Sequence, residues 1–178
     1  MLFLIGYRGT GKTTVAQRLA ERLHCAWVDA DVELERRAGK TIAQIFAEQG
    51  ETSFRDLESK VVAELATREN TIVALGGGAV LREENRRAIT GKGLIVWLQA
   101  DAQTLFDRIH SDPTTAERRP NLTAQGGLHE IEEVLRQREP IYRDTADLAL
   151  DTAHHSPDQI AEMILRHLAQ WPPVGDSA

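Results

Sequence analysis

The sequence predicts an α/β fold in which a five-stranded parallel sheet lies between two layers of helices. Three observations support this prediction. Short apolar runs alternate with amphipathic helical segments along the whole chain. The runs are apolar at consecutive positions, which is typical of parallel strands buried on both faces. The segments between the runs have helical periodicity, as right-handed crossover connections in such a sheet require.

Five segments are expected to be strands, because each is a short apolar run: 2–5, 26–28, 71–75, 94–98 and 148–150. Helical periodicity follows the first run, where Val15 and Leu19 belong to one apolar stripe. Two later helices are expected to begin at Thr41 and Ser156, because a glutamine three residues further on completes a capping box in each case. Residues 57–65 form another apolar helical stripe.

The chain is expected to form one domain over residues 1–170, since its 178 residues lie within the range of ~100–200 residues that is usual for a domain. Residues 111–127 interrupt the periodic pattern with two prolines and two glycines. A long irregular segment inside a compact domain is typical of a functional loop, so we predict a mobile lid there. Residues 171–178 are expected to be a disordered tail.

Composition excludes several classes of protein. The 21 Lys and Arg against 27 Asp and Glu give a net charge of −6 at pH 7, so neither nucleic acid nor a membrane surface is an expected partner. The single cysteine, Cys25, excludes an intrachain disulfide and is expected to be a small core residue. The apolar start is too short for a signal peptide, and no apolar helical stripe is left over for a partner. We therefore expect a cytoplasmic monomer.

A complete phosphate-binding loop follows the first expected strand. Residues 6–13 have the sequence GYRGTGKT, which matches the pattern G-x-x-x-x-G-K-T. Glycines allow backbone N–H groups to surround phosphate oxygens, and the next helix offers its positive N-terminus. Lys12 is expected to reach the outer phosphates, and the Thr13 hydroxyl to ligate Mg²⁺ directly. The triphosphate site is expected to comprise Gly9, Thr10, Gly11, Lys12, Thr13 and Thr14.

Carboxylates and glycines follow two other expected strands, at the edge where open α/β sheets bind ligands. Asp29 and Asp31 are separated by one residue, and in an extended segment they would point to opposite sides. One could then face Mg²⁺ and the other a substrate hydroxyl, or both could be solvated loop residues. Gly76, Gly77 and Gly78 permit the close approach of a small ligand, or form a plain tight turn.

Six motifs in this order resemble those of the shikimate kinase family. They are GYRGTGKT at 6–13, DAD at 29–31, FRDLE at 54–58, LGGGAV at 75–80, RRP at 118–120 and REPIYR at 138–143, and the resemblance spans about residues 2–168. It implies a P-loop kinase fold and the transfer of the γ-phosphoryl group of ATP to the 3-hydroxyl of shikimate. The products would be shikimate 3-phosphate and ADP, in the biosynthesis of chorismate and the aromatic amino acids, with Mg²⁺ as the cofactor.

The resemblance also implies which residues act on each ligand. Shikimate would contact six residues: Asp31, Arg55, Gly76, Gly77, Gly78 and Arg138. Asp29 would hold Mg²⁺ through water, and Arg119 would approach ATP from the lid. Lys12, Asp31 and Arg119 would act in catalysis. Arginine suits the carboxylate of shikimate because its planar fork can donate two parallel hydrogen bonds.

Three other features are less specific. Arg55 and Glu58 lie three positions apart, a spacing that also suits a surface ion pair. Arg108, at the end of the helix before the lid, is expected to pack against adenine, the alternative being surface exposure. His154 and His155 either stack on the base or are solvated loop residues.

Two other functions stay open at this point. A gluconate kinase of the same build would also bind a hydroxylated carboxylate, although the glycine triplet and the R-x-P-x-Y-R pattern favour shikimate. A slow nucleotide-binding switch would not need a second set of arginines around the glycine triplet. The dependence of ATP consumption on shikimate separates a kinase from a switch.

Overall fold

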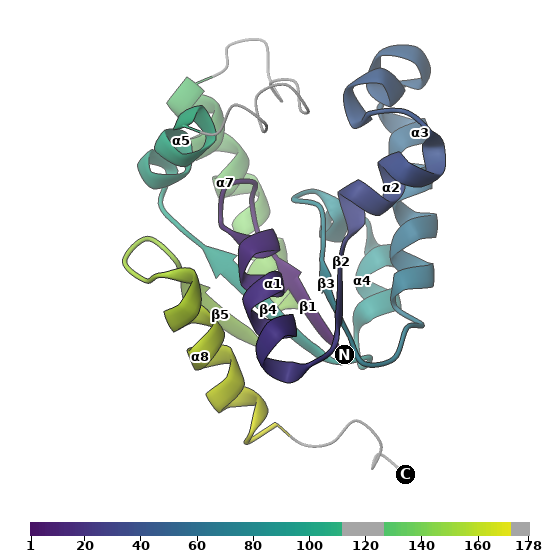
Figure 1. The fold of residues 1–178 in the computed structure, drawn as a ribbon. Coiled ribbons are helices and arrows are strands. Elements are labelled where there is room, and N and C mark those ends of the chain that lie inside the picture. The colour runs from purple at the N-terminus through teal and green to yellow at the C-terminus, as the bar shows by residue number, and fades with distance from the viewer. Residues whose placement is uncertain (112–126, 172–178) are drawn as a thin grey trace.

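The computed structural model describes residues 1–111 and 127–171, and in these residues a parallel five-stranded sheet has the order β2-β3-β1-β4-β5 (Figure 1). The strands are β1 (Leu2–Ile5), β2 (Ala26–Asp29), β3 (Thr71–Ala74), β4 (Leu94–Gln99) and β5 (Leu148–Asp151). All four strand pairs are parallel. The predicted sheet is therefore confirmed, and each predicted strand ends within one residue of the observed end.

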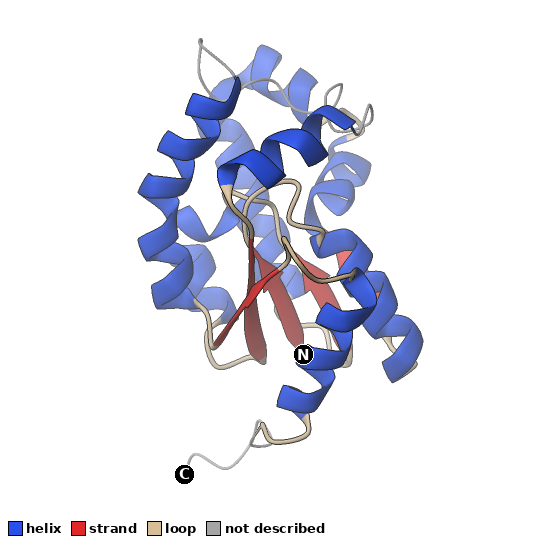
Figure 2. Cartoon of the chain, turned by 90° about the vertical axis from the view of Figure 1, so that its left-hand side faces the viewer, coloured by secondary structure: helices blue, strands red, loops and turns tan. Residues whose placement is uncertain are grey.

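Helices lie on both faces of the sheet, as Figure 2 shows. They are α1 (Lys12–Leu23), α2 (Ala30–Ala38), α3 (Ile42–Leu65), the short 3₁₀ helix η1 (Ala79–Leu81), α4 (Glu83–Ile89), α5 (Ala102–Ser111), α7 (Gly127–Thr145) and α8 (Pro157–Leu168). In the described part of the chain, no helix is long and apolar enough to cross a membrane.

The central strands divide their side chains between two hydrophobic clusters. In β1, Leu2 and Leu4 belong to the cluster that contains α1 and α8. Phe3 and Ile5 belong to the cluster on the other face, with residues of α2, α3 and α7. Because successive side chains of a strand point to opposite faces, a strand covered on both sides must be apolar at every position. This explains why continuous apolar runs in the sequence predicted the strands.

Both predicted capping boxes are confirmed, at the starts of α3 and α8. The two helices expected between residues 41 and 65 are joined in α3, with a kink at Gly50, whose φ of 80° is non-helical. Because proline usually ends or kinks a helix, Arg138 is expected from the sequence to lie near a helix end before Pro140, and this expectation is wrong. Helix α7 continues through Pro140 to Thr145, since a proline removes one N–H donor but tertiary packing can still hold the helix.

The second strand is less buried than its composition indicates. Strand β2 pairs only with β3 in the described sheet, so it forms an edge, and Trp27 is 38% exposed. Cys25 was predicted to be a small core residue. It packs against the α1–α8 cluster but is only half-buried, so it lies at the margin of the core. Of the predicted lid, the structure describes the ends only, where Ser111 closes α5 and Gly127 opens α7. Of the predicted tail it describes Trp171.

Candidate active site

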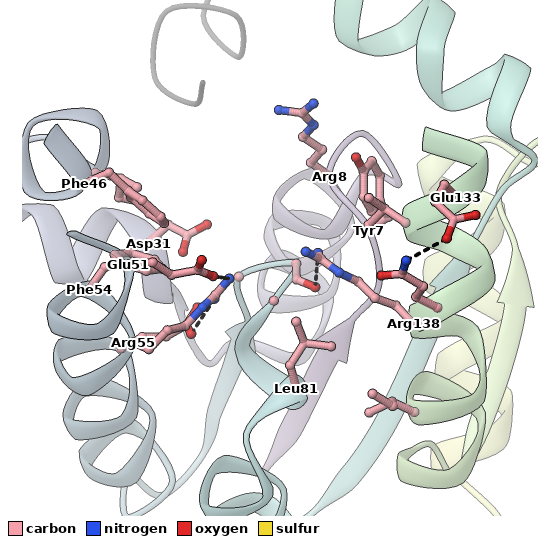
Figure 3. A pocket seen from close by; sticks show the side chains of 18 residues that line it. Tyr7, Arg8, Asp31, Phe46, Glu51, Phe54, Arg55, Leu81, Glu133 and Arg138 are labelled. Atoms are coloured by element: carbon pink, nitrogen blue, oxygen red, sulfur yellow. Dashed lines mark hydrogen bonds and ion pairs between the residues drawn. The ribbon is translucent and has the colours of Figure 1, made fainter. Parts of the chain in front are cut away.

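A cavity of about 660 Å³ lies at the carboxyl edge of the sheet (Figure 3). Its walls come from the segments that follow β1, β2 and β3 and from the helices α3 and α7. Open parallel sheets bind ligands at this edge, because the loops after the strands can vary without disturbing the core. The lining includes Asp31, Arg55, Gly76, Gly77, Gly78 and Arg138, so all six residues assigned to shikimate by the resemblance meet at one cavity.

The loop between β1 and α1 has the geometry of a phosphate cradle. Gly9 and Gly11 have φ values of 81° and 86°, which a residue with a Cβ rarely adopts. The Lys12 ammonium donates hydrogen bonds of 2.8 Å to the carbonyl oxygens of Gly6 and Tyr7, so it lies within the curve of the loop. Among the described residues, no side chain caps the first turn of α1 and no acidic residue lies in it. The positive end of α1 therefore suits an anion.

Thr13 and Asp29 meet beside this loop. The Thr13 hydroxyl donates a hydrogen bond of 2.7 Å to Asp29 Oδ2. The other carboxylate oxygen of Asp29 accepts from the backbone N–H groups of Asp31 and Val32, so Asp29 caps α2. A hydroxyl and a carboxylate are oxygen ligands of the kind that Mg²⁺ prefers. These two residues therefore fit a magnesium site.

The predicted extended geometry of the Asp29–Asp31 segment is wrong. Asp29 ends β2, and Asp31 already lies in the first turn of α2, because capping by Asp29 starts the helix at once. The two carboxylates still have separate environments. Asp29 contacts Thr13, whereas Asp31 is only 9% exposed and lines the cavity.

Arg55 and Glu58 form a largely buried ion pair on α3, in place of the surface pair considered as an alternative. Arg55 Nη1 lies 2.8 Å from Glu58 Oε2, and the two side chains are 14% and 4% exposed. Burial raises the pKa of Glu58, and the nearby Arg55 opposes this shift. Glu51 also contacts the Arg55 guanidinium, at 3.4 Å. The guanidinium is therefore held in one place at the wall of the cavity.

The glycine triplet makes room for two of these polar side chains. A Cβ on Gly76 would lie 2.5 Å from Asp31 Oδ1, and a Cβ on Gly78 would lie 2.5 Å from Arg55 Nη1. Both distances are shorter than any real Cβ contact, so larger residues would displace the carboxylate and the guanidinium. The triplet therefore leaves room for side chains of the protein itself, and the predicted approach of a small ligand stays a prediction.

Helix α7 forms the opposite wall. Arg138 Nη1 donates to the carbonyl oxygen of Gly77 at 3.2 Å, and the Tyr142 hydroxyl donates to the same oxygen at 2.5 Å. Figure 3 shows Arg55 and Arg138 entering the cavity from α3 and α7, on opposite sides. An anionic ligand between them would face a permanent positive charge on each side.

Arg108 links the phosphate-binding loop to the segment after β5. Its guanidinium donates to Thr152 Oγ1 at 3.0 Å, to the Thr152 carbonyl at 2.6 Å and to the Gly9 carbonyl at 3.4 Å. His154 and His155, in the same segment as Thr152, are exposed. Of the residues predicted to bind phosphate, Thr10 is buried and Thr14 is exposed. Arg119 lies outside the described residues.

Sequence reasoning missed two residues that line the cavity, Tyr7 and Arg8, and two residues of α7 that contact its walls, Glu130 and Tyr142. Tyr7 and Arg8 occupy variable positions of the loop motif, and Arg8 forms an ion pair of 3.5 Å with the buried Glu130 of α7. No sequence signal indicated this pair, whose members are 122 positions apart. Tyr142 could have been found, because it follows Arg138 by four positions and so lies on the same face of a helix.

The comparisons with known proteins agree with each other. Residues 8–169 match the family model described as shikimate kinase. The shikimate kinase of Rhodopirellula baltica is 46% identical over 165 residues, which cover 93% of this chain and 88% of that protein. The structure of a shikimate kinase from Acinetobacter baumannii in complex with shikimate has a TM-score of 0.88 and 33% identity, over 95% of this chain and 92% of that one. A gluconokinase from Sinorhizobium meliloti has a TM-score of 0.58, over 95% and 91% of the two chains, but at 16% identity it shows the fold alone.

Proposed function

This chain belongs to the shikimate kinase family, and we infer that it is a kinase that transfers the γ-phosphoryl group of ATP to the 3-hydroxyl of shikimate. The products are shikimate 3-phosphate and ADP, on the route to chorismate and the aromatic amino acids. The structural observation that best supports this function is the convergence of Asp31, Arg55 and Arg138 on one cavity next to the phosphate-binding loop.

We propose that different residues of the cavity bind the carboxylate and the reacting hydroxyl of shikimate. Arg55 and Arg138 donate to the carboxylate, since guanidinium groups form strong, charge-assisted hydrogen bonds with carboxylates. Asp31 accepts a hydrogen bond from the hydroxyl that attacks ATP and so orients its oxygen. Holding the nucleophile in line with the phosphorus is the main contribution that a phosphoryl-transfer enzyme can make. Asp31 then accepts the proton as the new bond forms.

The phosphate-binding loop acts on ATP. Lys12 donates to oxygens of the transferring phosphoryl group and stabilises the charge that spreads over them in the transition state. Thr13 directly, and Asp29 through water, would hold Mg²⁺, which neutralises charge on the phosphates. Arg119 is proposed to donate to ATP as well, and Arg108 to lie at the adenine end of the nucleotide. We also propose that residues 1–170 form one domain and that the protein is a cytoplasmic monomer.

An ADP-release assay tests the function directly. The purified full chain is supplied with ATP and Mg²⁺ and with shikimate, quinate, gluconate or no acceptor. Strong dependence on shikimate is the expected result. Equal ADP release without an acceptor would indicate the nucleotide-binding switch, and preference for gluconate would indicate the other kinase.

Two variants on one helix test the substrate site. Arg138→Met should raise the KM for shikimate by about 10–100-fold, the equivalent of losing one hydrogen bond to a charged group. Arg136→Met is the matched control, because this arginine lies on the same helix with its side chain 75% exposed. The KM for ATP should stay near the wild-type value in both variants. Equal effects of the two substitutions on shikimate would contradict the proposed role of Arg138.

A further inference from the structure

Two side chains of α7 donate hydrogen bonds to one carbonyl group in the described part of the chain. The acceptor is the carbonyl oxygen of Gly77, which Tyr142 Oη approaches to 2.5 Å and Arg138 Nη1 to 3.2 Å. The two donors are four residues apart, so they share a face of the helix. Gly77 is itself buried, at the centre of the glycine triplet.

The two donors differ in what else they can contact. Tyr142 is completely buried, and its ring stacks on Trp97 with centroids 5.8 Å apart. Arg138 is half-buried and lines the cavity. Burial raises the pKa of Tyr142 to about 12, although the charge of Arg138 opposes the shift. The phenol is therefore a neutral donor throughout the physiological range of pH, held away from any ligand.

A carboxylate that draws Arg138 Nη1 towards the cavity would take this donor from the Gly77 carbonyl. A buried carbonyl that loses its hydrogen bonds is destabilised, because it cannot turn to water instead. The short bond from Tyr142 removes this conflict, since the carbonyl keeps one donor when Arg138 turns to a substrate carboxylate.

We propose that Tyr142 is a positioning residue that satisfies the Gly77 carbonyl and thereby releases Arg138 to bind the carboxylate of shikimate. This inference rests on the proposed function of Arg138. It assigns a role to the tyrosine of the REPIYR motif without placing the phenol in contact with substrate. A phenylalanine would fill the same apolar space but could not donate to the Gly77 carbonyl.

Binding of shikimate to the full chain, measured by calorimetry, tests the proposal. Tyr142→Phe keeps the stacked ring and should raise the Kd for shikimate about tenfold, because Arg138 must then give up a hydrogen bond that nothing replaces. The kcat at saturating shikimate and the KM for ATP should stay near wild type. Thr145→Val is the matched control: it removes a hydroxyl from the same helix that donates to the Ile141 carbonyl at 2.6 Å. This control should leave the Kd unchanged.

A double-mutant cycle separates this role from a structural one. In an Arg138→Met background, Tyr142→Phe should weaken shikimate binding no further, because there is no guanidinium left to release. An equal loss in both backgrounds would overturn the proposal, since Tyr142 would then act on the shape of the cavity. Should Tyr142→Phe melt at a lower temperature, the shift of its Tm with shikimate concentration still reports the Kd.

The proposed function and this inference can fail separately. If Arg138→Met left the Kd for shikimate unchanged, the role of Arg138 in the proposed function would be wrong. If Arg138→Met weakened binding and Tyr142→Phe did not, the proposed function would stand and the role of Tyr142 would be refuted.

Discussion

Replacing Gly76 with alanine should lower kcat without unfolding the protein. The added Cβ would lie 2.5 Å from Asp31 Oδ1, about 0.9 Å short of the 3.4 Å at which ordinary van der Waals contact begins. It would also approach Glu58 Oε1 to 3.1 Å. The carboxylate of Asp31 is the group that must move, and its backbone is held in the first turn of α2 by the Asp29 cap. One added methyl group is therefore expected to displace the Asp31 carboxylate, which we propose orients the attacking hydroxyl.

The expected loss is large because orientation is sensitive to small shifts. A misplacement of about 1 Å in a positioning group can lower the rate about 10²-fold, and we expect a loss of that order in kcat for Gly76→Ala. Two-substrate kinetics by ADP release measures it, and circular dichroism confirms that the fold is kept. The KM for ATP should change little, because the methyl group would lie next to Asp31 and Glu58, away from the residues proposed to bind ATP.

The Asp31→Ala background supplies the control. Without the carboxylate, Gly76→Ala has nothing to displace at 2.5 Å, so the methyl group should add little to the loss that Asp31→Ala causes alone. A kcat for Gly76→Ala within about threefold of wild type, well below the loss expected from misplacement, would refute the reasoning. So would an undiminished effect in the Asp31→Ala background.

Three further predictions concern Lys12, Arg119 and Glu33. Lys12→Ala should keep the fold and abolish phosphoryl transfer; activity within about tenfold of wild type, ~1.4 kcal/mol of barrier, would show that this loop is not the catalytic site. Arg119→Ala should lower kcat by about 10²–10³ with little change in the KM for shikimate, as expected for a donor to the transition state, and an effect on that KM alone would contradict its assignment to ATP. Hydrogen bonds from Arg36 and Arg37 lower the pKa of Glu33 from 4.5 to about 2, so this carboxylate stabilises the fold above pH 4.5 and loses its effect as the pH falls towards 2. Glu33→Gln should therefore lower the Tm at pH 7, and the difference in Tm between wild type and variant should become smaller as the pH falls. A Tm difference that does not depend on pH would show that the charge of Glu33 is not its cause.

The local features were predictable because they depend on short stretches of chain. A strand covered on both faces must be apolar throughout, so Leu94–Gln99 was recognisable from its own residues. The capping boxes at Thr41 and Ser156 need only four consecutive residues each. Two local predictions failed where packing outweighed propensity: α7 passes through Pro140, and Trp27 stays partly exposed on an edge strand.

The sequence by itself determined the strands, the helix starts at Thr41 and Ser156 and the phosphate-binding loop, since the residues responsible are neighbours in the chain. Only the tertiary structure decided how the substrate cavity is built. The carbonyl of Gly77 meets Tyr142 across 65 positions, and Arg8 meets Glu130 across 122. Such contacts depend on where the crossover connections place each helix against the sheet, and no short pattern encodes that placement. The glycine triplet shows the difference most clearly. Its composition predicted room for a small ligand or a plain tight turn, but the packing of α2 and α3 determined that Asp31 and Arg55 are the side chains next to it.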